Sequence, residues 1–351
     1  MYITDLKCIS SQQTYTDHFI NGELNEIKEK TYLASEPNYL DFIPKGLLRR
    51  MGKAVRMGIG TGLPLVKKHD NIDGILIGTA NGGLEDCIKF LNQIVEYDEG
   101  TLTPTNFVQS TPNAVAGLLA LMGKNQSYNI TYTNGGTSFE NTLLDALLLF
   151  EENNAQKLLV GGLEEISDYN YNIDFLADKY KTELISTKDL LQSSTKGTIC
   201  GEGANMFILE KEADKYLAQI IDIEQITYPT KEDLSLLLNQ LLDRQKLSLE
   251  DISSIMLGYN GDKNHNTWYD FVGNDLLPDT DLYTFKQFVG DYRTVSSFGV
   301  WLSAQILNNS ISSKHSVLIR KGKNKSTTSK KYHLIYNHFD AVRHGFILLS
   351  N

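Results

Sequence analysis

The chain has 351 residues, of which 41% are apolar and 22% charged, and this composition predicts a globular protein with a sizeable core. Its formal net charge of -10 argues against nucleic acid as a partner, because phosphate binding needs a basic face. The three cysteines are scattered and give neither a disulfide framework nor a Cys/His metal cluster. The odd number of scattered cysteines fits a reducing cytoplasm, where we expect this protein, with neither a metal nor a cofactor. No apolar stretch reaches the ~20 residues that span a bilayer, so we expect no membrane span.

The first hundred residues predict two strand and helix units. Residues 4–11 indicate an opening strand and turn, and residues 73–94 a strand, a glycine turn and a helix. Between them, apolar residues recur at helical spacing at Leu47, Met51, Val55 and Ile59. The other faces of this helix hold basic residues, which we interpret as solvated, with a landing patch for an acidic partner as the alternative. These residues are Arg49, Arg50, Lys53 and Arg56.

The rest of the chain is organised around residues 128–162. Alternation over Asn129 to Thr133 predicts a strand, and Gly135-Gly136 then predicts a tight turn. Thr137 and Glu140 have the spacing of a capping box at the start of a helix. That helix is apolar on nearly every side over 143–150, so we expect it to be buried all round. A second strand, over 157–162, follows at once.

The second half repeats the order of the first. Residues 218–226 predict a strand, 231–247 an amphipathic helix, and 253–261 another strand. A second apolar helix begins near Ser296-Ser297, and closing strands follow, with a charged loop over 321–331. Strand, glycine turn, buried helix and antiparallel strands thus occur twice. We expect two halves, residues 1–215 and 216–351, in one compact unit.

Residues 128–162 resemble the centre of the β-ketoacyl synthase family, in which a Thr-Ala-Cys-Ser-Ser-like segment precedes a buried helix and a Gly-Gly strand. Residues 197–210 resemble the "G...GEGa..lvLE" signature of that family. A divergent branch of the family reads "SPT.Fs.SV.NA..G", matched here by Thr103-Pro104-Thr105, Phe107, Ser110 and Asn113-Ala114. The resemblance implies a thiolase-like α/β fold with five α-β-α-β-α layers, built from two pseudo-repeated halves. Such a fold requires the internal duplication, whereas a simple Rossmann sheet does not.

The resemblance also places the catalytic positions. Condensation by these enzymes uses a cysteine thiolate and two histidines. Counting back from Gly161-Gly162 puts Gly136 at the cysteine, and the two histidines fall at Asn260 and Asp291. The family lysine is retained as Lys286. The family's last glycine-rich turn aligns with residues 337–346, where Phe339 matches the motif and the glycines do not. We therefore expect no catalytic residues of the family type.

Two other groups offer alternative chemistry. Ser138 lies two residues past the turn, with His265 as its nearest candidate base, although a helix cap is the simpler interpretation of this serine. Cys200 falls inside the "GEGa" turn, where we interpret it as a small buried side chain. Residues 163–180 are rich in tyrosine, and we expect a loop with short helices over the site entrance.

A ketosynthase fold without a nucleophile resembles the chain length factors of type II polyketide and polyene systems, including the aryl polyene and flexirubin-type branch. Such a subunit pairs with an active ketosynthase and works with an acyl carrier protein. The resemblance implies pairing through the strand Asn129 to Thr133. It also implies that side chains at this interface shape the acyl tunnel, namely Phe107, Asn113, Val115 and Tyr132. The rival hypotheses are an acyltransferase using Ser138 and a stand-alone homodimeric acyl-binding or scaffold protein.

Overall fold

The structure is a computed structural model that describes residues 1–351 except 103, 312–316 and 324–329. Thr103 of the predicted motif and the middle of the predicted loop 321–331 lie outside the described residues. The main sheet has eleven strands in the order β11-β10-β9-β12-β13-β8-β1-β7-β5-β3-β4. A second, two-stranded sheet pairs β2 (Thr31–Tyr32) with β6 (Cys200–Gly201).

The two halves of the main sheet have the same topology. In the first half, β3 pairs in parallel with β4 and β5, β5 pairs antiparallel with β7, and β7 with β1. In the second half, β9 pairs in parallel with β10 and β12, β12 pairs antiparallel with β13, and β13 with β8. The first set is β1 (Tyr2–Ile9), β3 (Gly74–Gly78), β4 (Tyr128–Tyr132), β5 (Lys157–Glu164) and β7 (Gly203–Glu210). The second is β8 (Ala218–Thr227), β9 (Ile252–Leu257), β10 (Asp281–Thr284), β12 (Tyr332–Phe339) and β13 (Arg343–Ser350), with β11 (Leu318–Arg320) added beside β10.

This repeated strand order confirms the internal duplication expected from the sequence. The first set ends at Glu210 and the second begins at Ala218. Pairing between β1 and β8 joins the two sets into one continuous sheet. The domain boundary at residue 215 remains a prediction.

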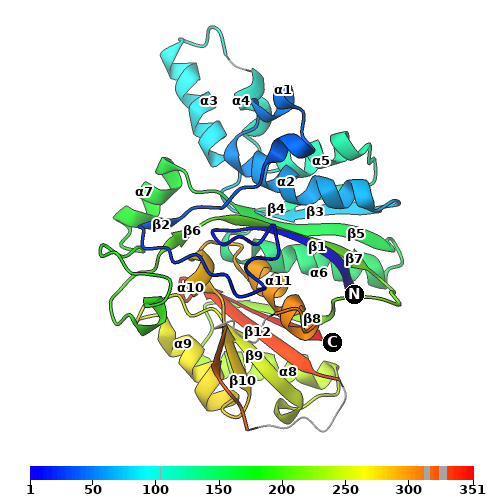
Figure 1. Ribbon diagram of the computed structural model, residues 1–351, viewed down its shortest axis with the longest axis vertical. Helices are drawn as coiled ribbons and strands as arrows, with labels where there is room; N and C mark the ends of the chain where they lie inside the picture. The colour runs from blue at the N-terminus through cyan, green and yellow to red at the C-terminus, as the bar shows by residue number, and fades with distance from the viewer. Residues whose placement is uncertain (103, 312–316, 324–329) are drawn as a thin grey trace.

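Helices form three layers around the two halves of the sheet (Figure 1). The outer layer on the first half is α2 (Lys53–Lys68) with α5 (Ala114–Gly123), and that on the second half is α8 (Lys231–Arg244) with α9 (Asn266–Asp270). Between the halves lie α6 (Ser138–Glu151) and α11 (Ser296–Leu307), which hold the largest apolar cluster. The fold is therefore the predicted five-layered α/β architecture.

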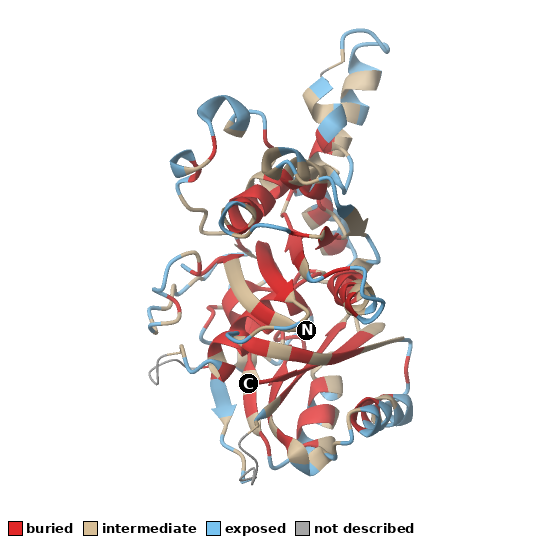
Figure 2. Ribbon diagram, turned by 90° about the vertical axis from the view of Figure 1, so that its right-hand side faces the viewer, coloured by how far each residue is buried: buried red, intermediate tan, exposed pale blue. Residues whose placement is uncertain are grey.

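The described part of the chain has five further α-helices. They are α1 (Lys45–Leu48), α3 (Leu84–Glu96), α4 (Pro104–Gln109), α7 (Asp168–Leu176) and α10 (Lys286–Val289). In Figure 1, α3 and α4 project from the top of the molecule, and Figure 2 shows that this end is mostly exposed or half-buried. None of the described helices combines the length and the apolar character that crossing a bilayer requires.

Two expectations for α6 are wrong. The helix is not buried all round, because Leu148 is 53% exposed on the side away from the core. The capping box is also absent: the Thr137 hydroxyl donates to the Asn134 carbonyl instead of accepting from the helix. Thr137 has φ -118° and ψ 18°, whereas a capping residue needs an extended backbone. Glu140 turns inward and is buried in the core.

Candidate functional site

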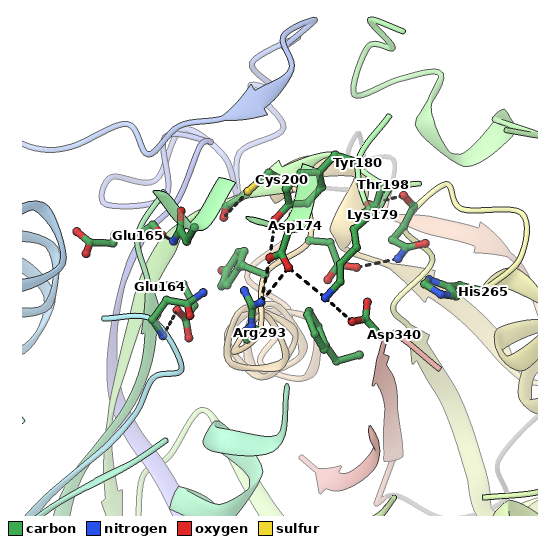
Figure 3. A pocket seen from close by; sticks show the side chains of 17 residues that line it. Glu164, Glu165, Asp174, Lys179, Tyr180, Thr198, Cys200, His265, Arg293 and Asp340 are labelled. Atoms are coloured by element: carbon green, nitrogen blue, oxygen red, sulfur yellow. Dashed lines mark hydrogen bonds and ion pairs between the residues drawn. The ribbon is translucent and has the colours of Figure 1, made fainter. Parts of the chain in front are cut away.

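The positions inferred from the sequence lie around one small pocket between the two halves (Figure 3). The pocket is about 30 Å³ in volume, which is enough for a water or two. Asn260, Asp291 and Phe339 contribute to its wall, and Gly136 lies directly behind Phe339. The pocket is therefore too small for an acyl chain in this conformation.

Gly136 has no room for a side chain. It sits in the turn Gly135–Thr137 that leads into α6. A Cβ built on Gly136 would lie 2.2 Å from the Cβ of Phe339 and 2.7 Å from its Cγ. Phe339 ends β12 and comes from the other half of the fold. The space in which a side chain at position 136 would emerge is thus filled by an aromatic residue.

Asn260, Asp291 and Lys286 form a buried polar chain. The Asn260 Nδ2 donates to the Asp291 Oδ2 over 2.7 Å. The Lys286 Nζ lies 2.9 Å from the Asp291 Oδ1 and is fully buried. It also donates to the His338 carbonyl over 3.3 Å. The lysine charge is thus compensated by the aspartate carboxylate.

A glycine turn positions Asp291. Gly290 ends α10 with φ +73°, a conformation that L-residues rarely adopt, and a Cβ there would lie 2.8 Å from the Gly201 backbone. The Asp291 N–H donates to the Ile199 carbonyl, and the Gly201 N–H donates to the Asp291 carbonyl. The retained glycine therefore brings the second half close to the "GEGa" strand of the first half.

A network of charged side chains covers Phe339. The Lys179 Nζ and the Arg293 guanidinium lie 5.3 Å and 5.1 Å from the centre of its ring. Both cations are paired with Asp174, and Lys179 is also paired with Asp340 at 2.7 Å. Cations over an aromatic face are attracted by its negative potential. The network therefore holds the ring in place behind the pocket.

Buried acids form the opposite side of the pocket. Glu164, at the end of β5, accepts hydrogen bonds from the backbone N–H groups of Ala80 and Asn81. Burial raises the pKa of Glu164 and of Glu165 to about 7. Burial also raises the pKa of the Cys200 thiol to about 12. Because the thiolate is the reactive form, Cys200 is a poor nucleophile here.

The alternative pair, Ser138 and His265, is not brought together by the fold. The Ser138 Oγ donates to the Gly135 carbonyl over 2.8 Å, and the residue is fully buried at the start of α6. His265 lines the pocket, and its Nδ1 lies 3.8 Å from the Asp262 carboxylate. Among the described residues, no hydrogen bond links Ser138 to His265. An attacking role for Ser138 would need a different conformation.

Comparisons with known proteins identify the fold in which this pocket lies. Residues 25–194 match the family described as "Beta-ketoacyl synthase, N-terminal domain". A search of curated protein sequences found no match to the chain. A β-ketoacyl synthase from Burkholderia phymatum is similar in structure, with TM-score 0.79, 13% identity, and coverage of 99% of this chain and 98% of that one. The chain has a ketosynthase-like fold, and residues 25–194 are similar to the N-terminal domain of that family.

Two further ketosynthase structures are similar over nearly the whole chain. The ishigamide ketosynthase/chain length factor has TM-score 0.79 and 12% identity, covering 100% of this chain and 98% of that one. A ketosynthase in complex with its chain length factor from Xenorhabdus doucetiae has TM-score 0.76 and 13% identity, covering 99% and 97%. At these identities the likeness shows the fold alone.

Two of the four predicted tunnel residues, Asn113 and Tyr132, lie at the sheet edge formed by β4. Phe107 and Asn113 are exposed, and the Asn113 Oδ1 accepts from Thr131 of β4 over 2.8 Å. Tyr132 is half-buried at the end of β4. Val115 is buried and packs against Gly58 of α2, within the core of the first half. Their role in a tunnel remains a prediction.

Two of the four basic residues on the first helices are paired with carboxylates. Arg56 makes two hydrogen bonds to Glu36, at 2.6 and 2.7 Å, and Lys53 pairs with Glu202 at 3.0 Å. Arg49 and Arg50 are exposed on the turn after α1. The solvated interpretation thus fits only the latter two.

Sequence reasoning missed the charged network over Phe339. Asp174, Arg293 and Asp340 come from three segments with no shared motif, so nothing in the sequence indicated their convergence. The acidic pair Glu164-Glu165 did carry a signal. Glu164 ends the buried strand that contains Gly161-Gly162, Glu165 follows it, and side chains at the carboxyl ends of parallel strands often line a site.

Proposed function

We propose that this chain is a catalytically silent ketosynthase-like subunit of the chain length factor type. It would pair with an active β-ketoacyl synthase and shape the acyl tunnel of the pair. The contact between Gly136 and Phe339 carries the proposal. A Cβ at position 136 would overlap Phe339 at 2.2 Å, so neither a cysteine nor another nucleophile fits there.

The groups at the two histidine positions support the same proposal. Decarboxylative condensation develops negative charge on an enolate, which donors or cations must stabilise. Asp291 would bring a carboxylate to that place, where it repels such a charge. Its charge is already paired with Lys286, so this lysine is not free to stabilise another anion. The charged groups at these positions thus pair with each other, and this pair leaves no cation for an enolate.

An open sheet edge supports a partner. β4 is the edge strand of the sheet in the first half. Among the described strands, it pairs with β3 on one side and with no strand on the other. Exposed strand edges pair readily with another chain. Beside β4, Asp145 of α6 accepts a hydrogen bond from Tyr128, and the exposed Leu148 lies one turn further along the same helix. We infer that an active ketosynthase pairs along this edge and that an acyl carrier protein supplies the pair.

The similar structures include assemblies of both kinds. One is a ketosynthase in complex with its chain length factor, and another is a type II polyketide ketosynthase with its acyl carrier protein. These assemblies belong to those proteins. For this chain, the heterodimer, the carrier protein, and a place in aryl polyene or flexirubin-type biosynthesis in the cytoplasm are proposals.

Co-expression with a candidate active ketosynthase tests the pairing. We expect one elution peak that contains both chains in equal amounts. Leu148→Asp should weaken the pair, because Leu148 lies beside the β4 edge. The matched control is Leu236→Asp, since Leu236 is 57% exposed on α8, in the outer helix layer of the second half. A self-dimer that ignores the ketosynthase would contradict the proposal and favour the homodimeric scaffold.

A further inference from the structure

We propose that residues 168–180 form a lid over the pocket and that the ion pairs of Asp174 latch this lid closed, whatever partner the chain binds. The lid consists of α7 and the four residues that follow it. Asn170, Asp174, Lys179 and Tyr180 from this segment form one wall of the pocket. Figure 3 shows Asp174 and Lys179 pointing inward from the lid toward Arg293 and Asp340.

The lid has almost no apolar anchor. Within α7, only Asn170 and Asp174 are buried, and both are polar. The aliphatic side chains of the helix, Ile173 and Leu176, point into solvent and are 61% and 83% exposed, and the half-buried ring of Phe175 stacks on Tyr171 within the lid itself. Helices in proteins are normally held by an apolar face. Hydrophobic burial therefore contributes little to holding α7 against the body of the protein.

Asp174 instead joins the lid to the body. Its carboxylate accepts two hydrogen bonds from Arg293, at 2.9 and 3.2 Å, in the segment leading into α11. It also pairs with Lys179 at 3.1 Å and accepts from the Tyr180 hydroxyl at 3.3 Å. Lys179 in turn reaches Asp340 in the turn between β12 and β13. These contacts link the lid to two distant segments.

The two ends of the lid are fixed and would serve as hinges. At the start, Ser167 and Asn170 form a capping box, and the Asn170 Nδ2 donates to the Glu165 carbonyl over 2.7 Å. At the end, Lys181 and Lys179 exchange backbone hydrogen bonds with Thr198. Between these anchors, the ion pairs of Asp174 with Arg293 and of Lys179 with Asp340 join the lid to the body. Because a buried charge that loses its partner is costly, removing Asp174 leaves Arg293 without this ion pair, whereas Lys179 keeps its pair with Asp340.

The chain contains its own reporters of lid opening. Cys200 lines the pocket beside Tyr180 and is only 5% exposed, so it should react with a thiol reagent only when the lid opens. Cys8 is 1% exposed in the core between the halves and reacts only on wider unfolding. Labelling by N-ethylmaleimide, mapped residue by residue by mass spectrometry, therefore separates local from global opening.

The test compares Asp174→Asn with Asp178→Asn. Asp178 follows α7 and forms an exposed ion pair with Lys196 at 3.4 Å, away from the latch. We expect Asp174→Asn to raise the labelling rate of Cys200 at least about tenfold while Cys8 is unchanged, and Asp178→Asn to change neither. Arg293→Gln should act as Asp174→Asn does, and hydrogen exchange should quicken over residues 168–180 in both variants.

Three results would overturn the proposal. One is an unchanged Cys200 rate in Asp174→Asn. Another is an equal rise for Cys8 and Cys200, which would show that the variant loosens the whole fold. The third is a rise in Asp178→Asn as large as that in Asp174→Asn, which would make any charge change in this segment sufficient.

Discussion

A methyl group at Gly136 should destabilise the protein, because the place it would occupy is filled. The added Cβ would lie 2.2 Å from the Phe339 Cβ, far inside van der Waals contact. Forcing atoms into a packed core typically costs about 1–3 kcal/mol. We therefore expect Gly136→Ala to lower the free energy of unfolding by about this amount, as measured by urea denaturation at an unchanged m-value.

Matched variants separate this clash from a general effect of replacing glycine. Gly46 in α1 has no atom within 4 Å of an added Cβ, so Gly46→Ala should not destabilise the protein. The Gly136 clash involves the Phe339 Cβ itself. For this reason Phe339→Gly should relieve it, whereas Phe339→Ala should not, and the double-mutant cycle should show a coupling of about 1–3 kcal/mol. A Gly136→Ala variant as stable as Gly46→Ala would refute the reasoning.

Further predictions concern buried charge, buried acid and base, and backbone strain. Lys286→Met leaves the Asp291 carboxylate without its cation in the core and should lower the free energy of unfolding by about 3–5 kcal/mol. A second substitution, Asp291→Leu, should restore part of this loss. A loss below about 1 kcal/mol in urea denaturation would contradict the prediction. Burial raises the pKa of Glu140 to about 7, so only the folded chain keeps this proton between pH 4.5 and 7, and stability falls as pH rises through that window. Glu140→Gln should therefore gain up to about 3 kcal/mol over the native chain between pH 5 and 8, whereas Glu151→Gln, on the exposed side of α6, should show no such trend. Burial lowers the pKa of His333 to about 3, so between pH 6.5 and 3 only the unfolded chain binds this proton, and stability falls as pH drops through that range. His333→Gln should therefore make the melting temperature less dependent on pH below 6.5. Ala341 holds φ +54° in the turn after Phe339, so Ala341→Gly should stabilise the chain by about 1 kcal/mol, and Ala177→Gly, at φ -87°, should not.

The sequence predicted the architecture because the same pattern of strand, turn and buried helix occurs twice. Apolar alternation and glycine positions are local signals, and they placed β4, β5 and both central helices. The capping box failed for a tertiary reason. Glu140 is drawn into the core between α6 and the start of α11, so its carboxylate cannot return to the helix end.

The candidate site could be predicted only in part. Motif spacing located Gly136, Asn260 and Asp291, and the last two form a direct hydrogen bond. The residue that fills the space at Gly136 is about two hundred positions away, and no local pattern links them. The ion pairs of Asp174 likewise join segments that only the folded chain brings together. Long-range packing of this kind leaves no trace in one sequence.

The most direct measurement offers the purified chain an acyl carrier protein that bears a labelled acyl group, and records the intact mass of the chain. A silent subunit should show no adduct, with or without its ketosynthase, while an active ketosynthase in the same assay acquires one acyl group. A stoichiometric adduct on this chain, mapped to Ser138, Cys200 or any other side chain, would contradict the account.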